Sequence, residues 1–76
     1  MNILYYSAAV RLENEITCVI GMQVLTTKEE IDIEKMECLY KFMIARYFGH
    51  AGVMAFAQID KESFELKTNL IITTDY

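Results

Sequence analysis

The sequence predicts an α+β fold, a two-layer sandwich in which a four-stranded antiparallel sheet in ββαββ order carries one long helix on one face. Two extended segments open the chain, residues 27–48 follow with helical periodicity, and two more extended segments close it. The 76 residues include no proline and only three glycines, so no linker is apparent. We therefore expect residues 1–76 to form a single compact domain.

The first two strands are expected at residues 3–12 and 15–25, joined as a hairpin by a two-residue turn at Glu13-Asn14. Both faces of the first strand are apolar, whereas the second places most apolar side chains at even positions. Gly21 in that strand indicates a bulge or a close approach. With Ile16, Ile20 and Met22 toward the helix, the open face of the sheet would hold Ile3, Tyr5, Val19 and Leu25; the reverse assignment stays open.

The helix is predicted over residues 27–48. Thr27 and Glu30 match a capping box at its start, and Gly49 suits the position after its last turn. At 100° per residue, one broad arc holds the side chains expected to face the core: Ile33, Met36, Leu39, Tyr40, Met43, Ile44 and Tyr47.

After the helix, the pattern predicts a strand over residues 53–59, a turn at 60–63 and a last strand over residues 64–74. Phe64, Leu66, Leu70 and Ile72 alternate with polar residues, which is typical of a strand with one buried face. We expect this strand to lie at or near an edge of the sheet.

A second apolar cluster lies on the far side of the predicted helix, among charged residues. It comprises Ile31, Cys38 and Phe42. An apolar cluster on a charged helix face indicates contact with another chain. The predicted partner-binding residues are Tyr5, Glu30, Ile31, Glu34, Lys35, Cys38 and Phe42.

Composition supports association. Hydrophobic residues make up 54% of the chain, yet a chain of this mass buries only about 60% of its surface on folding. We expect a homodimer or a tight complex with another protein to cover the excess. The net charge of −4 and the scattered basic residues argue against direct nucleic-acid binding. The acidic run from Glu29 to Glu37 suits a solvated helix start, with mimicry of nucleic acid as the alternative.

No transmembrane run or signal peptide is apparent, and two cysteines are too few for a disulfide framework. We therefore expect a cytoplasmic protein that does not bind membranes. Neither acidic cluster has the pattern of a metal site, and no nucleotide or cofactor motif is present, so neither metal nor cofactor is predicted.

These observations predict a small, acidic, non-enzymatic protein-interaction module of inhibitor or adaptor type that binds a larger macromolecule. Compact acidic proteins that phages encode against host defence complexes share this size and charge, which is an analogy only. Two alternatives stay open. One is a homodimeric module that binds a small ligand, and the other is a small enzyme using His50, the sole histidine, as a general base.

Overall fold

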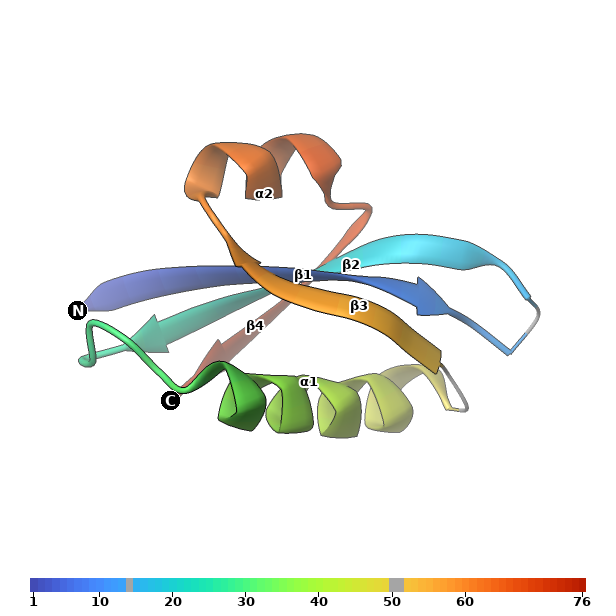
Figure 1. Ribbon diagram of the computed structural model, residues 1–76, viewed down its shortest axis with the longest axis horizontal. Coiled ribbons are helices and arrows are strands. Elements are labelled where there is room, and N and C mark those ends of the chain that lie inside the picture. The colour runs from blue at the N-terminus through green and yellow to red at the C-terminus, as the bar shows by residue number, and fades with distance from the viewer. Residues whose placement is uncertain (14, 50–51) are drawn as a thin grey trace.

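The computed structural model describes residues 1–13, 15–49 and 52–76, and it confirms an α+β fold with a four-stranded sheet (Figure 1). The elements, in chain order, are β1 (Asn2–Arg11), β2 (Thr17–Thr26), α1 (Ile33–Phe48), β3 (Gly52–Ile59), α2 (Lys61–Lys67) and β4 (Leu70–Asp75). The prediction of a single helix is wrong, because the described residues form two helices, α1 and α2. They lie on opposite faces of the sheet (Figure 1).

The strand order is β3-β1-β2-β4. β1 pairs antiparallel with β2 and with β3, whereas β4 pairs parallel with β2. The predicted all-antiparallel sheet is therefore wrong. After β3 the chain crosses the sheet through α2 and adds β4 at the opposite edge, so β3 and β4 are not hairpin partners. The predicted edge position of the last strand is confirmed.

The β1–β2 hairpin is confirmed, but its register, with Arg11 opposite Thr17, leaves a longer connection than the predicted two-residue turn. Leu12 N–H donates to the Ile16 carbonyl at 2.8 Å, and Glu15 N–H donates to the Leu12 carbonyl at 2.9 Å. Glu15 adopts a φ of 66°. Asn14, where we predicted the turn, lies outside the described residues. Ile16 is exposed, so its predicted position under the helix is wrong.

The core lies between the sheet and α1. Its buried residues are the even positions of β1 and β2 together with one stripe of α1: Leu4, Tyr6, Ala8, Val10, Ile20, Met22, Val24, Met36, Tyr40 and Ile44. The ring of Phe56 on β3 packs 5.4 Å from Tyr6 and 5.0 Å from Tyr40, measured between centroids. The predicted face assignment is thus confirmed for Ile20 and Met22.

α1 begins later than predicted. Its N-cap is Asp32, whose carboxylate accepts a hydrogen bond from Glu34 N–H at 2.9 Å. Thr27 is exposed and lies outside the helix, so the predicted start is wrong. Asp is as good a cap as Thr, and Asp32 directly precedes the apolar stripe. The predicted end is confirmed: Gly49 has a φ of 74°, and its N–H donates to the Ala45 carbonyl at 3.0 Å.

α2 replaces the predicted turn at 60–63 and the first part of the predicted strand 64–74. Asp60 caps it by accepting a hydrogen bond from Ser63 N–H at 2.7 Å, and this bond holds the pKa of the Asp60 carboxyl below its usual range. Glu62, Glu65, Leu66 and Lys67 are all good helix formers. The alternation of Phe64 and Leu66 spans too few residues to separate a strand from one helical turn.

Phe64 anchors α2 to the sheet face opposite α1. Its buried ring lies 4.9 Å from the ring of Tyr5. A Cβ on Gly21 would lie 2.5 Å from Phe64 Cε1 and 2.8 Å from Thr68 Cγ2. The close approach predicted at Gly21 is therefore confirmed, and the face we expected to be open is partly covered.

Within the described ranges, no helix has both the length and the apolar character needed to cross a bilayer.

Candidate protein-binding surfaces

The outward side of α1 carries a patch of one aromatic, one thiol and one charged side chain that do not contribute to the core. Lys35, Cys38 and Phe42, here called the outer α1 patch, are spaced by three and four residues and so share one side of the helix. All three are exposed, and Phe42 exposes 64% of its surface. The buried stripe of Met36 and Ile44 lies on the opposite side. The predicted outward position of these three residues is therefore correct.

Charged side chains surround the outer α1 patch. Glu34 is exposed in the first turn, and Arg46 lies in the last. Lys41 Nζ and Glu37 Oε2 form an ion pair at 2.9 Å, and this contact raises the pKa of Lys41. Charges of both signs therefore border an exposed aromatic ring, which is the composition of a small interface with an anchor and a polar rim.

Three of the predicted partner-binding residues lie outside α1. Ile31 precedes α1 and packs, half-buried, against the core. Its predicted place on the far side of the helix assumed a helix that begins at residue 27. Because α1 begins at Ile33, that prediction is wrong. Tyr5 lies on the other face of the sheet, against Phe64. Glu30 is exposed in the segment before Asp32, outside the helix.

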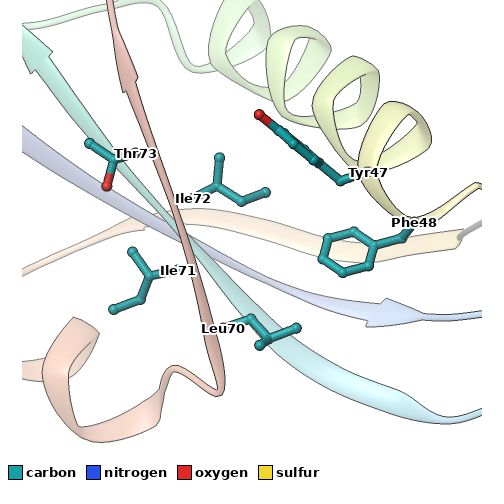
Figure 2. A pocket seen from close by; sticks show the side chains of 6 residues that line it. All are labelled: Tyr47, Phe48, Leu70, Ile71, Ile72 and Thr73. Carbon is teal, nitrogen blue, oxygen red and sulfur yellow. The ribbon is translucent and has the colours of Figure 1, made fainter.

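A groove between the end of α1 and the edge strand β4 was not predicted (Figure 2). It encloses about 400 Å³, and its lining residues are Tyr47, Phe48, Leu70, Ile71, Ile72 and Thr73. Figure 2 shows Leu70 and Ile72 on the side of β4 that faces α1, with Ile71 and Thr73 on the other side. We call this the β4 groove.

Tyr47 explains why the sequence did not reveal the β4 groove. It lies on the same helical arc as Met36, Tyr40 and Ile44, and the pattern therefore assigned it to the core. In the structure it is 64% exposed. The signal that was available, an aromatic pair at the end of the helix, becomes informative only when the position of β4 is known.

A shallower hollow of about 250 Å³ lies on the sheet beside α2. Small side chains dominate its lining: Ser7, Ala8, Ala9, Val19, Ala55, Phe56, Ala57 and Lys67. It has a single charged group, the Lys67 ammonium, and no aromatic ring other than Phe56. A hollow lined by methyl groups on a flat sheet offers little to orient a ligand.

The described residues assemble no catalytic centre of a familiar type. Among them, no three or more His, Cys, Asp or Glu side chains gather to hold a metal ion. His50, the proposed general base of the enzyme alternative, lies outside the described residues. Tyr40 has a raised pKa, first because of burial and second because of the nearby Cys18 thiol, but its hydroxyl donates to the Ile20 carbonyl at 2.8 Å. That bond makes Tyr40 part of the core.

Comparisons with protein families, with curated protein sequences and with solved structures give no match to this chain. The function is therefore inferred from the geometry of the outer α1 patch and the β4 groove.

Proposed function

We propose that this chain is a non-enzymatic protein-binding module of inhibitor or adaptor type, and that the outer α1 patch contacts a larger macromolecular partner. The observation that carries the proposal is the exposure of Phe42 on a helix whose core contacts are complete without it. A solvent-exposed aromatic ring costs solubility, and aromatic side chains dominate the binding energy of protein interfaces.

The charges favour a partner protein over nucleic acid. The net charge of −4 and the acidic Glu34 in the first turn of α1 oppose a phosphate backbone. Lys35 and the paired Lys41 add positive charge locally, so the patch suits a mixed protein surface. An inhibitor that a phage directs against a host defence complex is one instance of this class, proposed from size and charge.

The test compares Phe42→Glu with Met54→Glu in binding to a partner recovered from the source cells. Met54 is also apolar and exposed, at 54%, but lies on β3 away from the outer α1 patch. We expect Phe42→Glu to weaken binding by about 30-fold, the loss of a hot-spot residue of ~2 kcal/mol. Met54→Glu should bind like the wild type.

Both variants should melt at the wild-type temperature, because neither side chain belongs to the core. If the partner binds Phe42→Glu and the wild type equally, the outer α1 patch is not the binding surface. If it discriminates against Met54→Glu instead, the partner contacts the sheet.

A further inference from the structure

The outer edge of β4 presents unpaired backbone groups. β4 has a strand neighbour on one side only, β2. Tyr76 N–H donates to the Leu25 carbonyl at 2.9 Å, in phase with this parallel register. Because backbone groups alternate in direction along an extended strand, the N–H and C=O groups of Ile71 and Thr73 point away from β2. Among the described residues, no strand pairs with that edge.

Nothing in β4 protects this edge against pairing. Residues 70–74 carry no charge and no proline, and the β2–β4 register runs without a shift. The other edge strand, β3, differs. Its register against β1 shifts between Ala9 and Val10, so that Met54 has no partner. Such a bulge increases local twist and discourages further pairing. β4 is therefore the edge more open to another strand.

We propose that β4 pairs antiparallel with β4 of a second copy of this chain and joins the two sheets into one. A two-fold axis through the Ile72 position, normal to the sheet, relates the copies. Ile71 then lies opposite Thr73 of the second copy, and these residues exchange both backbone hydrogen bonds. The two Ile72 side chains meet across the axis.

This symmetry also closes the β4 groove. A two-fold axis normal to the sheet keeps each face on its own side, so both α1 helices and both grooves lie on the same face. The apolar linings, with Tyr47 and Ile72, become continuous across the axis. Association would shield surface that the single chain leaves exposed. Its accessible surface of 5086 Å² exceeds the about 4,800 Å² expected for a compact chain of this mass.

Charge favours the antiparallel direction and this register. The end of β4 carries Asp75, and Lys28, whose Nζ lies 4.9 Å from the Tyr76 ring centroid, brings Glu29 to the same end, so two carboxylates and one ammonium group lie there. Parallel pairing would place both acidic ends together. The antiparallel register centred on Ile72 sets Asp75 opposite Asn69 of the second copy, whereas centring on Thr73 would set it against Ile71.

Sedimentation equilibrium over a wide concentration range tests the proposal with Thr73→Pro and Thr73→Val. Proline removes an outward N–H without touching the β2–β4 ladder, since proline is tolerated at a sheet edge. We expect the wild type and Thr73→Val to dimerise, and Thr73→Pro to raise the dimer dissociation constant about tenfold or more, as two bonds are lost across the axis. Thermal melts confirm that both variants fold.

A wild type that remains monomeric to near-millimolar concentration would overturn the proposal, as would a Thr73→Pro protein that dimerises normally. A monomer whose β4 groove binds an apolar probe such as an anilinonaphthalene dye would assign the groove to a small ligand instead. Phe42→Glu should leave the dimer intact, so a failure here is separate from a failure of the proposed protein-binding function.

Disulfide cross-linking tests the register independently, in a Cys38→Ser background. Ile72→Cys places two thiols in a pair without hydrogen bonds, where Cα atoms are about 4.5 Å apart, within disulfide range. Ile71→Cys is the matched control. It is more exposed, at 58%, but its copy lies on a diagonal about 7–8 Å away. Rapid linking of Ile72→Cys alone supports the proposal, and equal or faster linking of Ile71→Cys overturns it.

Discussion

At the scale of single residues, Tyr40 joins α1 to the sheet in two ways. Its ring packs on Phe56, and its hydroxyl donates to the Ile20 carbonyl at 2.8 Å. Tyr40→Phe keeps the ring and removes the bond, so we expect the free energy of unfolding to fall by about 1 kcal/mol in urea titrations at neutral pH. Tyr47→Phe, which changes an exposed hydroxyl, is the control and should be neutral.

Tyr40 also makes the free energy of unfolding depend on pH. Burial raises the pKa of Tyr40, and also that of Tyr6, above the ordinary value of 10.0. The unfolded chain therefore loses these protons first. The stabilisation is complete below about pH 10 and is lost as pH rises toward the folded-state pKa values, at up to about 1.4 kcal/mol per pH unit for each tyrosine.

Unfolding measured at alkaline pH tests whether stability decreases above pH 10 as expected. Above pH 10, the free energy of unfolding of Tyr40→Phe should decrease less steeply with pH than that of the wild type. The decrease that remains should come from Tyr6. Urea midpoints measured at several alkaline pH values give the comparison. Identical slopes for Tyr40→Phe and the wild type would show that Tyr40 does not contribute to it.

At the scale of elements, the packing of α2 on β2 depends on the absence of a side chain at Gly21. Gly21→Ala would place a methyl group 2.5 Å from the Phe64 ring, which would have to move. We expect a loss of ~1–3 kcal/mol in the free energy of unfolding. The control is Gly52→Ala, where a Cβ meets nothing within 4 Å. Chemical denaturation measures both.

If α2 moves away without cost, Gly21→Ala and Gly52→Ala will have equal stability. That outcome would mean that the contact between Phe64 and Tyr5 contributes little. A second variant, Phe64→Ala, removes the ring and leaves Gly21 unchanged. Its loss of stability therefore measures directly how much the packing of Phe64 contributes.

At the scale of the whole molecule, strand order predicts a gradient of amide protection. β1 and β2 each pair on both sides, and they carry most of the core. Their amides should exchange slowest, because they open only with the whole domain. In β4, the outward amides of Ile71 and Thr73 should exchange fast in dilute protein and slow down as concentration rises. Hydrogen exchange followed by NMR at two concentrations measures this.

The inward amides of Ile72 and Thr74 serve as internal references, since they already bond to β2. If all four amides respond equally to concentration, the change reflects overall stability and does not report pairing at the β4 edge.

Helical periodicity predicts part of the outer α1 patch but not the β4 groove. Lys35, Cys38 and Phe42 were placed on the outward side of the helix because the 3.6-residue period holds within α1. Ile31 was misplaced because the period was extended past the true N-cap, Asp32. The β4 groove was not predicted, since its two walls come from residues 47–48 and 70–73, which are distant in the sequence.

The α+β class, the β1–β2 hairpin, the face that Ile20 and Met22 bury, and most of α1 can be predicted from local periodicity alone. The second helix and the direction of β4 depend on contacts between segments that are distant in the chain. The tertiary contacts of Phe64 with Gly21 and Tyr5 add to the Asp60 cap in holding α2 (Lys61–Lys67) on the sheet, and β4 pairs parallel with β2 because α2 carries the chain across the sheet. Both outcomes depend on long-range contacts, and a short segment such as α2 carries too little local preference to specify them.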